Sequence, residues 1–278
     1  MDRADVAAYW EGNADTWTRH SRAGYDVYRD ALNTPAFLSI LPPINGLPGL
    51  DIGCGEGSNT RKLAERGARM HAVDIAPTFI AHAQAQERTA PLGIDFQVGD
   101  GMALPFADAS FDFATSFMAF MDMPDQHLAF REVARVLRPD GFFQFSILHP
   151  CFVPPHRRNL RDAEGQPRAV EVARYFDGTD GEVESWWFGS VSHEEREKVA
   201  PFRIPRFHRT LSTWVDFIVG AGLVIEKFAE PCADIETAEA QPEVADTRIA
   251  PIFLHIRARK PGAAQEPSVE LRASSGRR

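Results

Sequence analysis

The sequence predicts an α/β fold built on a doubly wound, mostly parallel sheet. From Gly49 onward, apolar runs typical of buried strands alternate with helical patterns. A glycine-rich turn, Gly53-Cys54-Gly55-Glu56-Gly57, follows the first of these strands and leads directly into a helix. In such sheets ligands bind outside the carboxyl ends of the strands, where the strand order reverses. The residues just after each strand are therefore the candidates for function.

Composition and charge narrow the class of protein. The chain has 278 residues, 44% hydrophobic and 25% charged, enough for one large domain or a domain with a cap. A net charge of −9 disfavours a nucleic-acid partner, because such proteins usually display a basic face. Three well-separated cysteines favour a reducing compartment. With no signal pattern or long apolar run read, we expect a cytoplasmic protein with no membrane partner.

Residues 1–43 are predicted to form an N-terminal helical lid. Helical patterns cover 4–20 and 25–41, with a break near Gly24 and a stop at Pro42-Pro43. The segment is rich in aromatic side chains: Tyr9, Trp10, Trp17, Tyr25 and Tyr28. These side chains either pack against the rest of the domain or close over a ligand, and both interpretations stay open.

Residues 44–149 are predicted to form the nucleotide-type core. The expected strands cover 48–52, 69–74, 93–98, 111–117 and 141–148, and the expected helices cover 58–66, 76–88 and 126–137. Glycines in the turn after the first strand let a ligand approach the backbone, because they carry no Cβ. Asp74 closes the next strand about 20 positions later, where it suits a ribose diol. Asp51, just before the turn, suits an ammonium group better than a pyrophosphate, which favours an amino-acid nucleoside as ligand.

The last third of the chain departs from the alternation and then returns to it. Residues 150–207 are predicted to be a cap inserted after the fifth strand; a surface excursion or a dimer contact is the alternative. Residues 208–260 are predicted to complete the sheet with a helix capped by Thr210 or Ser212 and strands near 223–229 and 251–259. Residues 261–278 are expected to be a disordered tail.

Several motifs in order resemble those of the class I S-adenosylmethionine-dependent methyltransferases, in the type 11, ubiquinone- and menaquinone-biosynthesis-like branch. The resemblance spans roughly Trp10 to Lys260. Its motifs are Asp51–Gly57, Val73–Ile75, Val98–Phe106, Ser110–Asp112 and Val136–Gly141. Asp140 departs from the family's usual Gly-Gly turn, but Gly141 still supplies a permissive position. The resemblance implies a Rossmann-like methyltransferase fold whose seven-stranded sheet ends in an antiparallel pair, with S-adenosylmethionine as cofactor.

The resemblance also implies which residues contact the cofactor. Asp100 would bond the adenine amino group, and Ile75 and Met102 would sandwich the ring. Arg22 or Tyr25 of the lid would reach the cofactor carboxylate. The full set of expected cofactor contacts is Arg22, Tyr25, Asp51, Gly53, Cys54, Gly55, Gly57, Asn59, Asp74, Ile75, Asp100, Gly101, Met102 and Phe117.

The acceptor side is less defined by the sequence. His149, delivered by the fifth strand, is the first candidate general base and His208 the second, because a neutral imidazole near pH 7 suits proton removal. His208 and Arg209 could equally tie the cap to the body, and His149 could be structural. The expected acceptor-binding residues are Phe120, Met121, Trp186, Trp187 and Arg209.

These observations predict methyl transfer to a small-molecule acceptor, most often through oxygen or nitrogen in such enzymes. A non-catalytic protein that binds S-adenosylmethionine or S-adenosylhomocysteine is one alternative, and a nicotinamide-dependent oxidoreductase is another. The histidines and cysteines lie too far apart in the sequence to predict a metal site. A homodimer stays open.

Overall fold

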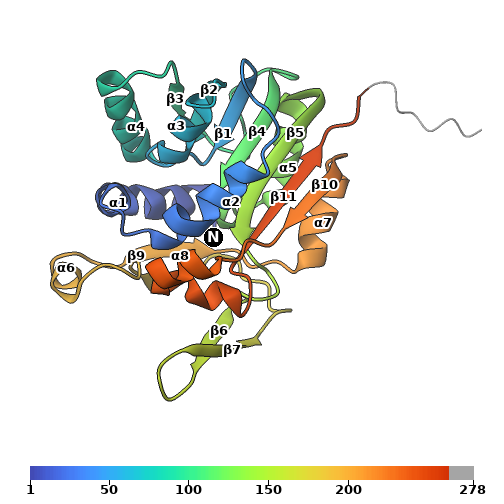
Figure 1. Ribbon diagram of the computed structural model, residues 1–278. Coiled ribbons are helices and arrows are strands. Elements are labelled where there is room, and N and C mark those ends of the chain that lie inside the picture. Colours follow the sequence, from blue (N-terminus) through green and yellow to red (C-terminus); the bar gives the residue numbers. More distant parts are fainter. Residues whose placement is uncertain (263–278) are drawn as a thin grey trace, which may run out of the picture.

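The computed structural model describes residues 1–262, so all but the first two residues of the expected tail lie outside the described part. A seven-stranded sheet forms the centre, in the order β10-β11-β5-β4-β1-β2-β3 (Figure 1). The strands are β1 Pro48–Ile52, β2 Arg69–Asp74, β3 Asp95–Val98, β4 Phe111–Phe117, β5 Leu137–Leu148, β10 Val224–Ala229 and β11 Phe253–Arg259. β11 runs antiparallel to both β5 and β10, and β1 to β5 pair in parallel. The predicted fold class is confirmed.

Helices cover both faces of this sheet because apolar side chains alternate between the two sides of each strand. One face packs against α2 Thr34–Ser39, α3 Ser58–Ala64 and α4 Pro77–Thr89. The other packs against α5 Gln126–Val136 and α7 Leu211–Gly220. The helix α7 is capped by Thr210, whose side chain accepts a hydrogen bond from Thr213 N, as one of the two predicted caps requires.

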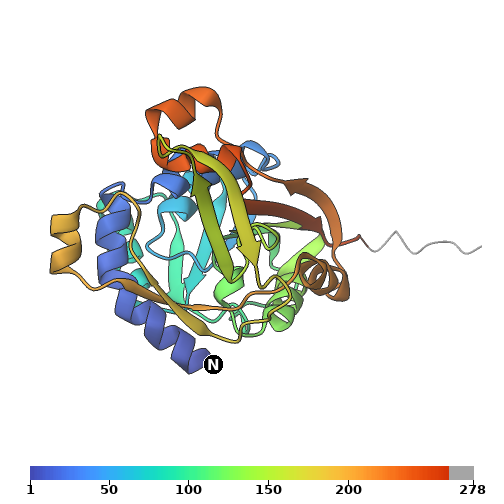
Figure 2. The ribbon, with the colours of Figure 1, turned by 90° about the horizontal axis from the view of Figure 1, so that it is seen from below.

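The strand order reverses between β1 and β4, since β2 and β3 follow on one side of β1 and β5 lies beyond β4. This is the point at which such sheets bind ligands. Three parts of the chain gather at this edge: α1 Arg3–Arg22, the segment after β5, and the helices α8 Ile235–Ala240 and η3 Pro242–Arg248 (Figure 1). Figure 2 shows the same edge from below, with the inserted strands in front of the sheet.

The second predicted N-terminal helix, expected over 25–41, is an unbroken helical run over 27–39 that changes geometry along its length. It forms a π-helical turn, η1 Arg29–Asn33, followed by α2. Pro35, which has no backbone N–H, stands in the first turn of α2, where a missing donor is tolerated. The periodicity that predicted a single helix over 25–41 therefore merges two helical geometries.

The insertion between β5 and α7 is ordered as two hairpins. β6 His156–Arg161 pairs with β7 Pro167–Ala173, and β8 Glu182–Trp186 pairs with β9 Phe202–Arg206, with α6 His193–Lys198 between the latter two strands. An aromatic cluster joins the second hairpin to α1: the ring of Trp17 lies 4.8 Å from Phe188 and 4.9 Å from Phe202. Among the described residues, none of the helices combines the length and apolarity that a membrane crossing needs.

Candidate functional site

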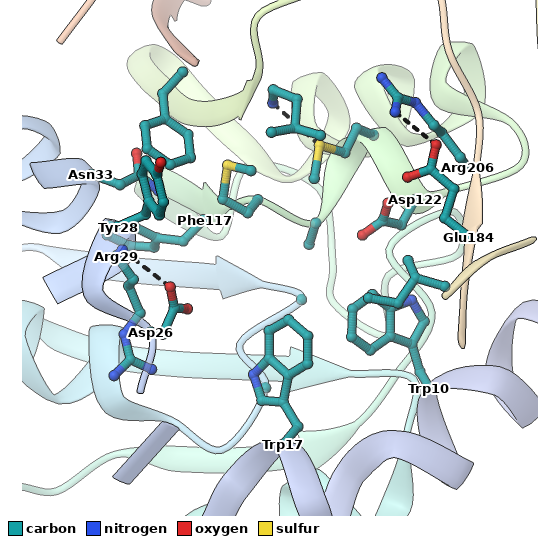
Figure 3. A pocket seen from close by; sticks show the side chains of 18 of the residues that line it. Trp10, Trp17, Asp26, Tyr28, Arg29, Asn33, Phe117, Asp122, Glu184 and Arg206 are labelled. Atoms are coloured by element: carbon teal, nitrogen blue, oxygen red, sulfur yellow. Dashed lines mark hydrogen bonds and ion pairs between the residues drawn. The ribbon is translucent and has the colours of Figure 1, made fainter. Parts of the chain in front are cut away.

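A cavity of about 600 Å³ lies at the edge where the strand order reverses. Its floor is the glycine turn after β1 and the ends of β2, β4 and β5, and its roof is α1, the insertion and η3. Figure 3 shows Trp10 and Trp17 of α1 facing the interior, with Tyr28 and Arg29 on one side and Asp122 on the other. The cavity therefore joins the predicted core to the predicted lid and cap.

The glycine turn is held in a fixed shape close to this cavity. Gly53 and Gly55 adopt positive φ angles of 72° and 55°, which glycine tolerates best. The backbone N–H groups of Gly53 and Cys54 both donate to Val73 O, at 2.8 and 3.0 Å, which ties the turn to β2. A Cβ at Gly53 would collide with the Cβ of Ala119. Gly53 therefore allows close packing against Ala119, whereas Gly55, which has no heavy atom within 4 Å of a Cβ, offers bare backbone to whatever occupies the cavity.

Asp51 lies at the end of β1, beneath the turn. Its carboxylate accepts hydrogen bonds from Thr60 Oγ1 at 2.6 Å and from Thr115 Oγ1 at 2.9 Å, and the residue is 1% exposed. Burial raises the pKa of Asp51 to about 6, and the nearby charge of Asp74 adds to the rise. Each oxygen keeps a second lone pair, so the carboxylate can accept one further donor from the cavity.

Asp74 closes β2 and points to the same side. Its two oxygens accept from the backbone N–H groups of Gly55 at 2.8 Å and Ala76 at 3.0 Å. Burial raises the pKa of Asp74 to about 6. The remaining lone pairs fit a vicinal diol, which would donate one hydroxyl hydrogen to each oxygen.

The turn after β3 supplies a third acid. Asp100 accepts from Met102 N at 2.8 Å, which closes the turn, and from Arg3 of α1 at 3.1 Å. Met102 is 3% exposed and lines the cavity together with Ile75. The geometry of an apolar slot beside an acid matches the adenine contact that the sequence resemblance implies.

Most of the expected cofactor residues line the cavity together. They are Tyr25, Asp51, Gly53, Cys54, Gly55, Asn59, Asp74, Ile75, Asp100, Gly101, Met102 and Phe117. The donors and acceptors among them, and the bare turn at Gly55, fit an amino-acid nucleoside.

Arg22 and Gly57 do not line the cavity, and these two predictions are corrected. Arg22 donates to Glu56 at 3.4 Å and to the backbone carbonyl of His82 at 3.2 Å, so it braces the outside of the turn. Gly57 is the residue before α3, and a Cβ there would lie 2.8 Å from the ring of Phe96, which makes it a packing position.

Two expected acceptor-side residues are also placed elsewhere. Phe120 is fully buried, with its ring 4.8 Å from Phe143 and 5.1 Å from Phe130, so it belongs to the core. His149 is 2% exposed and has both ring nitrogens engaged: Cys151 N donates to Nδ1 at 3.2 Å, and Nε2 lies 2.8 Å from Glu230 Oε1. The prediction of His149 as general base is therefore corrected to a structural role at the start of the insertion.

Met121, Trp186, Trp187, His208 and Arg209 do line the cavity. His208 Nε2 lies 2.8 Å from the carbonyl oxygen of Tyr175, and because a carbonyl can only accept, Nε2 carries a proton. Burial lowers the pKa of His208, so its ring is neutral near pH 7. Arg209 donates to the backbone oxygen of Thr179 at 2.7 Å and pairs with Asp180 at 3.0 Å. These two residues thus border the cavity and also tie the insertion to α7.

Three groups of cavity residues escaped the sequence analysis. They are Asp26, Arg29 and Glu56 beside the turn, Arg157, Asn159 and Asp246 in the roof, and Asp122, Glu184 and Arg206 near β4. The first two groups are assembled from distant segments and leave no local pattern. Asp122 did carry a signal, because it is the one acid in the Met- and Phe-rich run that leaves β4. Within residues 1–262 no three His, Cys, Asp or Glu side chains come together as a metal site requires.

Comparison with known sequences points to one family. Residues 50–145 match a family model described as a methyltransferase domain. The chain is 38% identical to an O-methyltransferase of Penicillium expansum, over 40% of this chain and 42% of that protein. It is 40% identical to the 2-methyl-6-phytyl-1,4-hydroquinone methyltransferase of Synechocystis, over 37% of this chain and 32% of that protein. A probable tocopherol O-methyltransferase of Oryza sativa is 32% identical over 59% of this chain, and the chain spans less than half the length of each of these relatives.

Solved structures extend the similarity over most of the chain. A crystal structure of an S-adenosylmethionine-dependent methyltransferase from Mesorhizobium loti is 29% identical, with a TM-score of 0.65 over 81% of this chain and 96% of that one. A Haemonchus contortus phosphoethanolamine N-methyltransferase 2 in complex with S-adenosyl-L-methionine has the same fold, with a TM-score of 0.53 at 18% identity. The fold is thus one that S-adenosylmethionine-dependent methyltransferases share.

Proposed function

We propose that this chain is a class I S-adenosylmethionine-dependent methyltransferase that transfers the methyl group of S-adenosylmethionine to a hydroxyl oxygen of a small molecule. The observation that carries the proposal is the glycine turn, with open space at Gly55, Asp74 beside it at the end of β2 and a cavity of about 600 Å³ in front of it. Oxygen is the proposed acceptor atom because two of the relatives are named as O-methyltransferases, one of them as probable.

The proposed cofactor position follows from the strand ends. Asp74 accepts the two ribose hydroxyls, and Asp100, Ile75 and Met102 hold the adenine. The amino-acid end passes over the turn toward Asp51, where an ammonium group meets the carboxylate. Tyr25 and Asn59 line the same side of the cavity and are assigned to the cofactor carboxylate.

When bound, S-adenosylmethionine supplies a methyl group on a positively charged sulfur, open to in-line attack. The chain's own contribution is to hold the acceptor in line and to exclude water. Such positioning can supply about 7–11 kcal/mol in well-oriented cases. The apolar wall needed for exclusion is present: Met121 comes from the β4 side, and Trp186 and Trp187 come from the insertion. We assign α1 as the lid and residues 150–207 as the cap, with neutral His208 as a hydrogen-bonding group for the acceptor.

The test is binding followed by turnover. Calorimetry with S-adenosylmethionine and NAD side by side should give binding of the first alone, and Asp74→Asn should weaken it by about tenfold or more, since a charged acceptor becomes neutral. Labelled cofactor should then transfer methyl groups to members of a panel of phenols and hydroquinones. Binding of NAD in place of S-adenosylmethionine would contradict the proposal. Binding without transfer to any hydroxyl compound would favour a sensor of the cofactor.

The setting of the reaction is proposed from charge and cysteines. The three free cysteines, Cys54, Cys151 and Cys232, suit a reducing compartment such as the cytoplasm. The net charge of −9 supports a small-molecule partner over a nucleic acid. A homodimer remains a prediction, which light scattering of the purified protein will test.

A further inference from the structure

One carboxyl group in the cavity, that of Asp122, is assigned neither to the cofactor nor to the acceptor. Asp122 ends the short 3-10 helix η2 Phe120–Asp122, just after β4, and is 7% exposed. No side chain or backbone N–H within residues 1–262 donates a hydrogen bond to its carboxylate. Figure 3 shows this carboxyl group directed into the cavity. An isolated buried carboxylate is costly, so its retention calls for a partner that enters the cavity.

The nearest charges do not neutralise Asp122. Arg206 of β9 donates to Glu184 of β8 at 2.8 Å and to the backbone oxygen of Val153, so its charge is already paired. Figure 3 shows this pair beside Asp122 without a bond to it. Burial holds the pKa of Asp122 well above its usual range, while Arg206 lowers it and Glu184 raises it. The site thus lacks one positive charge.

The residues on either side of Asp122 lie against the cofactor turns. Ala119, just before η2, occupies the space that a Cβ of Gly53 would need. Met123, just after it, brings its Cε to 2.7 Å from where a Cβ of Gly101 would stand, and its Sδ to 3.2 Å. Asp122 is therefore carried by a segment that packs on both turns assigned to S-adenosylmethionine. It lies on the β4 side of the reversal point, facing the chamber lined by Met121 and Trp186.

We propose that Asp122 is the counter-charge of the cofactor's sulfonium and takes up the proton of the acceptor hydroxyl on a carboxylate oxygen. This inference rests on the proposed function. The acceptor oxygen forms a bond to the methyl carbon, the carbon–sulfur bond breaks with its electron pair left on sulfur, and the hydroxyl proton passes to Asp122. The charges of carboxylate and sulfonium then disappear together, which favours the reaction in an enclosed cavity of low polarity.

Asp122 is better suited than His208 to remove the proton of the acceptor hydroxyl. The Nε2 of His208 already donates to Tyr175, and burial together with Arg206 and Arg209 makes its ring a weaker base. Burial makes the carboxylate of Asp122 a stronger base than an ordinary one.

The first experiment is calorimetry with S-adenosylmethionine and with S-adenosylhomocysteine, which lacks the positive charge. Asp122→Asn should weaken the first by about tenfold or more relative to the second, in line with the effect of an opposite charge nearby. Asp122→Glu should keep the preference. Asp26→Asn, the same change on the opposite side of the cavity, should alter both affinities alike. Titrations in buffers of different ionisation enthalpy should show that the wild type releases protons on binding S-adenosylmethionine, and Asp122→Asn should reduce that release.

The outcomes separate the two proposals. A wild type that binds neither ligand would remove the proposed function and this inference with it. A wild type that binds both, with the affinity ratio unchanged in Asp122→Asn, would overturn the inference alone. Retained binding of S-adenosylhomocysteine by Asp122→Asn shows that the variant is folded.

The second experiment tests proton removal with para-substituted phenols of different acidity. Asp122→Asn should lose about 10²–10⁴-fold in kcat with weakly acidic phenols. It should lose far less with phenols that are already ionised at the assay pH. An equal loss across the whole panel would overturn the proton step and make Asp122 a positioning residue.

Discussion

Two glycines of the same turn differ in what surrounds them. Gly53 and Gly55 both have positive φ, but a Cβ would collide with Ala119 only at Gly53, and no heavy atom lies within 4 Å of a Cβ at Gly55. The pair therefore separates backbone strain from crowding.

We expect Gly55→Ala to destabilise the protein by about 1–2 kcal/mol, the cost of the left-handed conformation for a residue with a Cβ. Gly53→Ala should cost about 1–3 kcal/mol more, because Ala119 must move. Urea unfolding of the two variants measures the difference. Equal costs would mean that η2 and the turn are not tightly packed.

The acids at the strand ends predict how cofactor binding depends on pH. Asp74 has a pKa raised to about 6, and only its ionised form accepts hydrogen bonds at both oxygens. Affinity for S-adenosylmethionine should therefore fall by about tenfold between pH 6 and pH 5. Titrations across this range should show a shallower fall for Asp74→Asn, and an unchanged slope would assign the effect to another group.

The raised pKa values of Asp51 and Asp74 also affect the free energy of unfolding of the free protein, and this quantity changes with pH in the opposite direction to the binding affinity. Because folding raises the pKa of Asp51 and Asp74 from 3.8 to about 6, their contribution to stability is fully present below about pH 4 and is lost as pH rises through 6. The two acids thus cost stability at neutral pH, where they are ionised for binding.

A site residue can be predicted from the sequence when it also stands at a recognisable position in a local pattern, such as the end of an apolar strand. Asp51 and Asp74 each end an apolar strand, so their place could be foreseen from the chain alone. His149 also follows a strand directly, but its ring nitrogen Nε2 is engaged by the carboxylate of Glu230, which lies far away in the sequence. Asp26 lines the cavity from just before the π-helical turn η1, and the helical pattern over 25–41 gave no sign of that role. Tertiary partners decided these cases, and a single sequence does not reveal them.

At the scale of elements, the carboxylate of Asp246 in η3 links the segments that form the roof of the cavity. This carboxylate accepts from Tyr28 at 2.8 Å, from Asn159 of β6 at 2.8 Å and from Arg157 of β6 at 3.3 Å. The Tyr28 hydroxyl also lies 2.6 Å from the backbone oxygen of Glu243, so its single proton is shared between the two acceptors. One acid thus connects the N-terminal segment, the first inserted hairpin and the C-terminal helices.

We expect Tyr28→Phe to reduce stability by about 1–2 kcal/mol through the lost hydrogen bonds and to expose residues 150–207 to limited proteolysis. Tyr9→Phe is the matched control, since the hydroxyl of Tyr9 makes a single contact at 3.4 Å, with Arg203. If both variants resist protease like the wild type, the network does not hold the hairpin.

Elements of the sheet were foreseen more closely than those of the insertion. The predicted strand over 111–117 agrees with β4, and the one over 69–74 agrees with β2, because buried strands carry continuous apolar runs. The strands β6 and β7 are polar and largely exposed, with the burial pattern of a surface hairpin. Without an apolar face they leave no periodic signal, so the sequence predicted an insertion but not its strands.

At the scale of the whole molecule, the cavity is enclosed by parts far apart in sequence. Trp17 of α1, Trp186 of β8 and Phe253 of β11 all line it. We expect part of this roof to move aside when a nucleoside enters. α1, with its aromatic contacts to the second hairpin, is the assigned lid.

Hydrogen exchange should therefore slow in α1 and in residues 182–206 when S-adenosylmethionine is added, because the bound molecule holds the roof closed. The core helix α5, with Phe130 fully buried, serves as the internal reference and should not change. Slower exchange confined to the turn would mean that the ligand enters without movement of α1.

The separation between the turn and the inserted hairpins has a consequence for how such a protein diversifies. The nucleoside of the cofactor is assigned to residues between Asp51 and Met102. The cavity walls that would contact the methyl acceptor come largely from residues 150–207. Because the two hairpins pair within the insertion and not with the central sheet, they form a unit that can be transplanted. A chimera that carries a relative's hairpins on this scaffold should acquire the relative's acceptor specificity and keep the affinity of this chain for the methyl donor.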